Sequence, residues 1–332
     1  RQKLGGEQPV LELPTDRARP ALPSRAGAQV AVDLELSMIN DLKALAQRQG
    51  VTLFMLLLAS FQTLLQRYTG QAEVRVGVPV ANRTRAEIER LIGFFVNTQV
   101  LKAEFETHAT FIEVLQQVKH TALEAQAHQD LPFEQLVDAL QPQRSLNHSP
   151  LFQVMFNHQT DVKGARQSLP GLTVEGLDWQ AHSTQFDLAL DTVEHHTGLS
   201  AAFTYATQLF DASTIEQMSR HWRNLLRAVI EQPGQRVDEL ALLDDAERRK
   251  IVRSWNRTEA VYPGKRYVQQ RFEHQVRRQP EAIALLFAEH TLSYAQLNCR
   301  ANRLAHKLRE LGVGPEVLVG VALERSLEMV VG

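Results

Sequence analysis

The chain has 332 residues, a formal net charge of −2 and a single cysteine. Its length corresponds to about two domains, and hydrophobic residues, at 44% of the chain, are numerous enough to form buried cores. The near-neutral charge argues against nucleic acid binding through bulk charge, and one cysteine excludes a disulfide scaffold. The longest nearly unbroken apolar run, Leu53–Ala59, is much shorter than the ~20 residues of a membrane span.

The first 30 residues are rich in proline, glycine and alanine, which predicts an extended connector. A helix is expected to begin at a cap on Ser37 and to end at Gly50, and a second helix to begin at Thr52 and end at Gly70. The stretch 73–81 carries valine at every second position, so it predicts a half-buried strand.

The middle of the chain alternates between strand and helix patterns. Residues 92–101 are rich in β-forming residues, although three polar side chains interrupt them. Capping boxes at Thr110–Glu113 and Ser213–Glu216 predict two long helices. Further strands are expected at 151–156, 172–177, 186–193 and 199–207.

From 237 to 265 the pattern breaks into acidic, basic and turn residues, which indicates a domain boundary that begins with a short helix. Beyond it we expect a helix around Phe272, a strand at 282–287, a helix capped by Ser293 and a strand at 317–323. This order is the start of an α/β unit. The sequence opens at Arg1 with no readable signal peptide, and we expect both ends to continue into a longer protein.

Three polar residues, Asn97, Thr98 and Gln99, stand in an otherwise apolar strand pattern directly after Gly93 and two aromatic residues. Such groups are useful where a backbone approaches a ligand and presents hydrogen bonds. The alternative is an ordinary strand end with polar residues that cap a loop, and composition alone favours this alternative.

The segment 128–134 follows one predicted helix and starts another at Pro132. His128 and Asp130 could form an acid–base pair, because a carboxylate can orient an imidazole. Alternatively, Asp130 caps the second helix and His128 ends the first. Their positions favour the alternative.

Other chemistry-bearing residues carry weaker patterns. His195 and His196 lack the further ligands that a zinc site needs. Serines 149, 168 and 183 have no glycine-flanked elbow, and no glycine-rich phosphate loop is present. Cys299 is interpreted as a bystander thiol.

Taken in order, three segments resemble successive signatures of condensation domains of nonribosomal peptide synthetases. They are Ile92–Gln99, His128–Glu134 and Arg144–Phe152. Residues 9–17 resemble the connector that leads into the second lobe of such domains, and residues 292–297 are similar to the first signature of an adenylation domain. The resemblance therefore covers essentially the whole chain.

The resemblance implies an α/β fold of mixed α+β character, in which a chloramphenicol-acetyltransferase-like lobe combines a mixed sheet with packed helices. The truncated start of an adenylate-forming α/β domain would follow this lobe. The implied organisation is a connector at 1–29, the second condensation lobe at 30–243, a linker at 244–265 and the N-terminal part of an adenylation domain at 266–332.

The resemblance also implies roles for individual residues. It assigns to a substrate channel Gly93, Phe95, Val96, Asn97, Thr98 and Gln99. A mostly structural role is implied for His128, Gln129, Asp130, Pro132, Phe133, Glu134, Arg144, Pro150 and Leu151. The first adenylation signature contributes Leu292, Ser293, Tyr294 and Leu297. Ser149 stands where the family usually has Asn, and His148 where Arg is common, so any hydrogen bond made by that Asn is in doubt here.

No catalytic residue is assigned, because the family's His-His-x-x-x-Asp-Gly motif is not in this sequence and His195–Ala201 does not match it. The implied function is amide bond formation between carrier-bound thioesters, followed by the start of ATP-dependent amino acid activation. We expect the chain alone to be inactive and to bind no metal or cofactor. The complete module would use phosphopantetheine, ATP and Mg²⁺.

The expected partners are upstream and downstream carrier domains, a first lobe and the rest of the adenylation domain, with no nucleic acid and no membrane. A cytoplasmic location fits the single cysteine. Two alternatives remain open, a stand-alone acyltransferase of the same fold and a non-catalytic segment that docks carriers. The adenylation-like tail argues against the first alternative.

Overall fold

The structure is a computed structural model with two compact units, Arg1–Asn256 and Arg257–Gly332. The described residues are 3–6, 8–21, 24–83, 85–140, 148–160, 183–260 and 267–332.

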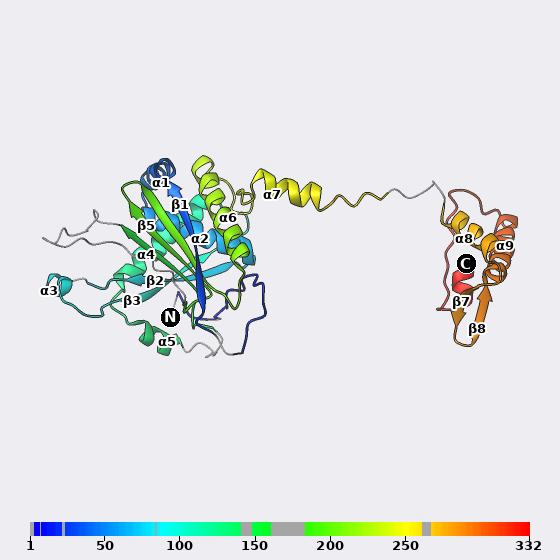
Figure 1. Cartoon of the computed structure of the whole chain (residues 1–332), viewed down its shortest axis with the longest axis horizontal. Coiled ribbons are helices and arrows are strands. Elements are labelled where there is room, and N and C mark those ends of the chain that lie inside the picture. Colours follow the sequence, from blue (N-terminus) through cyan, green and yellow to red (C-terminus); the bar gives the residue numbers. More distant parts are fainter. Residues whose placement is uncertain are drawn as a thin grey trace. The chain divides into compact units, whose positions relative to one another are not determined.

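A six-stranded mixed sheet forms the first unit, with the strand order β1-β6-β5-β4-β2-β3 (Figure 1). Strand β4 is parallel to both of its neighbours, β2 and β5, and the other pairs are antiparallel. The mixed sheet agrees with the predicted fold class. The strands are β1 (Gly27–Glu35), β2 (Glu73–Val80), β3 (Asn97–Glu104), β4 (Val154–Thr160), β5 (Leu188–His195) and β6 (Gly198–Ala206).

Helices cover one face of this sheet. Alternate side chains of β2, namely Val74, Val76 and Val78, are buried in the main core together with residues of the four longest helices of the unit. The helices of the first unit are α1 (Leu36–Gln49), α2 (Leu53–Thr69), α3 (Ala86–Glu89), α4 (Phe111–Ala127), α5 (Phe133–Leu140), α6 (Ala212–Glu231), α7 (Asp245–Arg249) and the π-helix η1 (Lys250–Ser254). Within the described ranges no single helix is long and apolar enough to span a membrane, and only α1 and α2 pass that test as a pair, bent by 101°.

Several helix ends follow the sequence signals. The hydroxyl of Thr52 accepts a hydrogen bond from the amide of Met55, and Gly70 ends α2 with a φ of 70° that glycine adopts without strain. Thr110 and Glu113 form the predicted capping box of α4.

Two predicted caps are wrong. Helix α1 begins one residue before Ser37, after Glu35, and α6 begins after Asp211 rather than at Ser213. Neither capping residue makes a side-chain cap hydrogen bond. At α6 the connector supplies the contacts instead, because Asp16 accepts hydrogen bonds from the Asp211 amide and the Thr214 hydroxyl.

The connector prediction and two strand predictions need correction. β1 lies partly inside the predicted connector, although the alternation of Val30, Val32 and Leu34 is its sequence signal. β3 begins only at Asn97, and residues 92–96 form no strand. β4 begins at Val154 because residues 150–152 form a turn. The strand predicted at 172–177 lies outside the described residues.

The second unit contains a two-stranded sheet and three helices among its described residues. The predicted strand at 317–323 does not form. Leu318 is 99% exposed, and no strand of the described part pairs with this run, so its backbone has no ladder. The elements are α8 (Val268–Arg278), β7 (Ile283–Phe287), β8 (His290–Ser293), α9 (Tyr294–Glu310) and α10 (Leu327–Val331).

Candidate functional site

The first two predicted segments meet at the side chain of Asn97. Its Nδ2 donates hydrogen bonds to the carbonyl oxygens of Gln129 (2.9 Å) and Leu131 (2.8 Å). Its Oδ1 accepts from the amides of Thr98 (2.9 Å) and Phe133 (3.1 Å). Asn97, at the start of β3, therefore fixes the turn before α5 and caps that helix.

His128 and Asp130 do not form the acid–base pair that the sequence allowed. Both side chains are exposed, and the described contacts include no hydrogen bond between them. His128 is the C-cap residue of α4, as the alternative interpretation predicted. The cap of α5 comes from Asn97 and not from Asp130.

Gln99 performs a similar task at the other end of the turn. Its Nε2 donates to the carbonyl oxygen of Ala125 at 2.7 Å, in the last turn of α4. The same carbonyl accepts a hydrogen bond from the His128 amide at the end of α4, so Gln99 supplies it with a second donor. The amides of Asn97 and Gln99 thus join β3 to the α4–α5 turn.

Arg83 organises the segment before Asn97, and sequence reasoning missed it. Its guanidinium lies 4.4 Å from the ring centroid of Phe95 and donates to the carbonyl oxygens of Ile88 and Leu91. The neighbouring Phe94 faces outward, since it is 90% exposed. This contact spans twelve residues whose only regular element, within the described part, is the four-residue helix α3, so no periodic pattern predicts it.

The third segment joins the other two through aromatic packing. The Phe152 ring lies 5.6 Å, centroid to centroid, from that of Phe133. Leu151, Phe152 and Val100 are buried in a second core cluster, against which α5 packs. Because Val100 and its buried neighbour Leu101 point to opposite faces of β3, this cluster lies on the sheet face away from the main core. Arg144 lies outside the described residues.

Gln153 is a second residue of this region whose contacts the sequence did not reveal. This buried side chain accepts a hydrogen bond from the amide of Leu11 (2.7 Å) and donates to the carbonyl oxygen of Ser149 (3.1 Å). It therefore ties the connector to the third segment. Nearby, the Asp187 carboxylate accepts hydrogen bonds from both terminal nitrogens of Arg19, and this raises the pKa of the guanidinium.

A cavity of about 310 Å³ lies beside His128, between α4 and β3. The described contacts pair both of its lysines with acids, Lys3 with Glu124 and Lys102 with Glu104. The cavity therefore offers apolar walls and paired charges rather than a free cation. Its lining residues are Lys3, Leu4, Val100, Lys102, Thr121, Glu124, Ala125 and His128.

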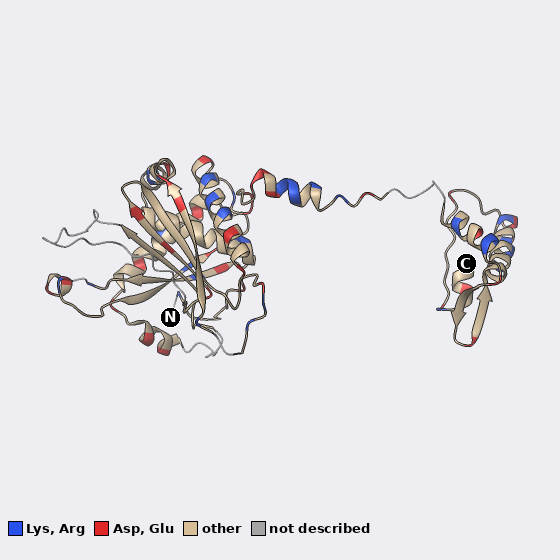
Figure 2. Cartoon of the chain, viewed as in Figure 1, with Lys and Arg blue, Asp and Glu red and all other residues tan. Residues whose placement is uncertain are grey.

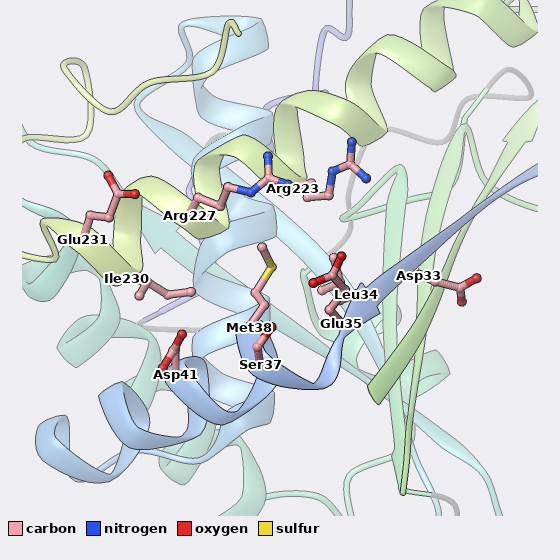
Figure 3. Close-up of a pocket in the computed structure, with 10 residues that line it drawn as sticks. All are labelled: Asp33, Leu34, Glu35, Ser37, Met38, Asp41, Arg223, Arg227, Ile230 and Glu231. Atoms are coloured by element: carbon pink, nitrogen blue, oxygen red, sulfur yellow. The ribbon is translucent and has the colours of Figure 1, made fainter. Parts of the chain in front are cut away.

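A separate cavity of about 280 Å³ lies between α1, α6 and the end of β1 (Figure 3). Arg223 and Arg227 reach toward it from α6, and Asp41 from α1. Among the described contacts these charged groups form no ion pair with one another. Figure 2 shows that basic residues gather along α6 and α7.

The histidine pair sits in the β5–β6 hairpin, where His195 joins a hydrogen-bonded chain. The Ser200 hydroxyl donates to Asp33 (2.9 Å), and Nε2 of His195 lies 3.1 Å from the same hydroxyl. Because Ser200 gives its proton to Asp33, His195 is not positioned as its base. Within the described ranges no group of three or more His, Cys, Asp or Glu side chains could hold a metal ion.

The adenylation signature residues form one corner of the second unit. Ser293 and Gln296 form the predicted capping box of α9. Leu292 and Leu297 are buried on either side of this cap. Tyr294, the first residue of α9, packs against Phe272 of α8 with a centroid separation of 6.0 Å.

Comparison with known protein families tests the predicted resemblance. A family model described as "Condensation domain" matches residues 1–252, which is most of the chain. The chain belongs to the condensation-domain family. A second model, described as "AMP-binding enzyme", matches residues 272–332. The predicted resemblance to a nonribosomal peptide synthetase, with a condensation region followed by the start of an adenylation region, is confirmed.

Relatives and solved structures agree with this condensation-domain assignment. Tyrocidine synthase 3 of Brevibacillus parabrevis is 41% identical over 329 residues, which cover 99% of this chain and 5% of that protein. A crystal structure of holo-AB3403, a four-domain nonribosomal peptide synthetase, has a TM-score of 0.75 at 25% identity and covers 92% of this chain and 24% of its own. An X-domain from teicoplanin biosynthesis, in complex with OxyB, has a TM-score of 0.67 at 30% identity over 74% of this chain and 54% of its own. The chain spans only 4% to 8% of the length of the curated relatives that it matches.

Proposed function

We propose that this condensation region acts in amide bond formation between carrier-bound thioesters, within a multimodular synthetase. The supporting observation is the meeting of the three predicted segments, through Asn97 and through the Phe133–Phe152 contact, around the β3 edge of the sheet. In this proposal, this edge carries one wall of the substrate channel. The wall comprises Gly93, Phe95, Val96, Asn97, Thr98 and Gln99.

The proposed reaction joins two substrates held on carrier domains. The amine of the acceptor attacks the thioester carbonyl of the donor; the carbon–nitrogen bond forms and the carbon–sulfur bond breaks. The thiol leaves on the donor's carrier, and the amine loses a proton. Because the thioester is already activated, placement of the two substrates supplies much of the rate.

We assign no catalytic base to this chain. The sequence contains no His-His-x-x-x-Asp-Gly motif, and His196 is followed by Thr197 and Gly198. The base belongs to a first lobe in the proposed module. What this chain contributes is the geometry of the wall, which its own hydrogen bonds hold in place.

The proposal includes partners and cofactors of the complete module. The partners are upstream and downstream carrier domains, a first lobe and the rest of the adenylation domain. Phosphopantetheine on the carriers, together with ATP and Mg²⁺ at the adenylation domain, would supply activation, and we place no site for them on these residues. A cytoplasmic location, where ATP is made available, is part of the same proposal.

A stand-alone acyltransferase of the same fold is the second candidate. The AMP-binding match at 272–332 disfavours it, since an acyltransferase that acts alone has no use for this segment. A segment that only docks carriers is the third, and it predicts that substitutions at Asn97 leave the condensation rate unchanged.

The test uses the complete module with both carriers loaded. Mass spectrometry of intact carriers measures dipeptidyl thioester, and pyrophosphate exchange measures adenylation in the same preparation. We expect Asn97→Ala to lower the condensation rate by about tenfold to a hundredfold and to leave adenylation unchanged. Asn224→Ala is the matched control, because Asn224 also donates to a backbone carbonyl, that of Leu242, but lies far from Asn97 in sequence.

Two results would contradict the proposal. The first is that the wild-type module adenylates its amino acid but forms no dipeptidyl thioester. The second is dipeptidyl thioester formed by the 332-residue chain alone above a no-protein control, because the chain is expected to be inactive without a catalytic base.

A further inference from the structure

Residues 150–152 form a strained turn in the middle of the candidate site. The amide of Phe152 donates to the carbonyl oxygen of Pro150 at 2.9 Å, a hydrogen bond between residues two apart. Leu151, between them, has a φ of 67°. Together these features define a γ-turn of the positive-φ form, which is rare and strained for a residue with a side chain.

The strain at Leu151 is maintained by burial. Leu151 is only 4% exposed and Phe152 only 2% exposed. A bulky residue persists in this backbone region only where its surroundings over-determine it, and such residues concentrate at functional sites. The turn directs Phe152 across the sheet immediately before β4 begins.

Gly77 of β2 leaves the space that the Phe152 ring occupies. A Cβ atom built on Gly77 would lie 2.3 Å from Cε2 and 2.5 Å from Cζ of Phe152. Gly77 is also the residue of β2 that pairs with Met155 of β4. The ring therefore lies against the backbone where two strands distant in sequence join, and no other residue type than glycine leaves room for it.

Phe152 is the centre of an aromatic cluster (Phe133, Phe152 and Phe186). Its ring centroid lies 5.6 Å from that of Phe133 at the start of α5 and 5.5 Å from that of Phe186, just before β5. The Phe133 amide is the one that Asn97 caps. Phe152 thus contacts the α4–α5 turn directly and β3 through that turn.

We propose that Phe152 is a positioning residue, held by the Leu151 γ-turn and the Gly77 gap, that fixes the 128–134 turn relative to β2, β4 and the 97–99 segment of β3. The geometric part of this inference stands on the contacts alone. Its consequence for condensation rests on the proposed function, in which residues 97–99 belong to the channel wall and the 128–134 turn supports them.

The first arm of the test measures hydrogen exchange on the full chain. We expect Phe152→Leu, which keeps an apolar side chain but removes the ring, to raise amide exchange in 128–134 by about tenfold and to leave β5 and β6 unchanged. Phe210→Leu is the matched control, because Phe210 is 1% exposed in the main core. Unchanged exchange in 128–134, or the same rise in Phe210→Leu, would overturn the proposal.

A double-substitution cycle tests the contact between Gly77 and Phe152 through stability, so the proposal does not depend on the behaviour of one variant. Gly77→Ala is expected to destabilise the wild-type chain because its methyl group collides with the Phe152 ring. In the Phe152→Ala background the ring is gone, so the same substitution should cost much less. Equal losses of stability in both backgrounds would show that Gly77 and Phe152 do not act as a pair.

The second arm measures condensation in the complete module. A positioning role predicts that Phe152→Leu lowers kcat several-fold and leaves KM for the loaded acceptor carrier unchanged, whereas Phe210→Leu changes neither. An unchanged kcat, or a loss confined to KM, would overturn the role in positioning. If the wild-type module forms no dipeptidyl thioester, the proposed function fails, and the exchange arm still decides what Phe152 does.

Discussion

The Oδ1 atom of Asn97 accepts a hydrogen bond from the backbone amide of Phe133 at 3.1 Å, across 36 residues of sequence. The same side chain donates to two carbonyl oxygens of the preceding turn. One amide therefore satisfies three backbone groups of a segment that has little other regular structure. This makes Asn97 the main polar connection between β3 and the α4–α5 turn.

Replacement of Asn97 should loosen that turn before it affects the sheet. Asn97→Ala removes the partner of the Phe133 amide and of two carbonyl groups. These groups are part-buried or exposed, so water can replace part of the lost contact, and we expect a loss of about 0.5–1.5 kcal/mol in the free energy of unfolding. Hydrogen exchange should rise in 128–134. In Asn224→Ala, the matched control, exchange in that turn should not change, and a rise there would count against the assignment.

A buried histidine makes stability depend on pH. Nδ1 of His221 is hydrogen-bonded to the Tyr68 hydroxyl (2.7 Å), and its Nε2 is hydrogen-bonded to the Glu247 carboxylate (3.2 Å). Burial lowers the pKa of His221 from its usual 6.5, although Glu247 and Asp244 oppose the shift while Arg220 adds to it. Burial also raises the pKa of Tyr68, so its hydroxyl stays protonated.

The sign of this pH effect follows from proton binding. A histidine whose pKa is lowered in the folded chain takes up its proton in the unfolded chain first, so the free energy of unfolding falls as the pH drops below about 6.5. His221→Gln keeps one donor and one acceptor and should show a smaller loss between pH 7 and pH 5.5 in chemical denaturation. His158→Gln is a useful comparison, since burial lowers the pKa of His158 as well. Equal losses in wild type and His221→Gln would contradict this prediction.

Local signals predicted much of the fold. Thr110, Ser293 and Gly70 mark helix ends because capping and a left-handed backbone depend on the residue itself and on near neighbours. The cap at Ser213 was wrong because α6 begins after Asp211, where Asp16, a residue far away in sequence, accepts hydrogen bonds from the Asp211 amide and the Thr214 hydroxyl. Alternation alone did not make 317–323 a strand, because a strand also needs a partner.

The candidate site shows the same contrast between local signals, which the sequence contains, and long-range contacts, which it does not. The motif order identified the segments, but the actual contacts between them are long-range and carry no periodicity. The link from Asn97 to Phe133 and the Gly77 gap for Phe152 depend on which strands are neighbours. Gln153 and Arg83 were missed for the same reason, since single polar residues outside the motifs give no signal of the backbone groups that they reach.

Arg83 should order residues 86–95 through the planar geometry of its guanidinium group as well as through its charge. Arg83→Lys keeps the charge but cannot reach several carbonyl groups at once while stacking on Phe95. We expect faster limited proteolysis between 86 and 95, with a loss of about 0.5–1 kcal/mol from the ring contact. Arg90→Lys, at the exposed end of α3, is the control and should be cleaved at the wild-type rate. Equal cleavage of both variants would show that the contact does not order the loop.

The second unit should be less protected against hydrogen exchange than the first. Among its described residues only Leu292 and Leu297 are buried hydrophobic side chains, and its sheet has two strands. A two-stranded sheet with so small a core is marginally stable in water. Helix α2, in contrast, is buried on almost every side. We therefore expect protection factors in α9 to be about a hundredfold lower than in α2 when both are measured in the same full-length chain. Equal protection in the two helices would mean that α9 packs against more of the chain than the contacts of 267–332 provide.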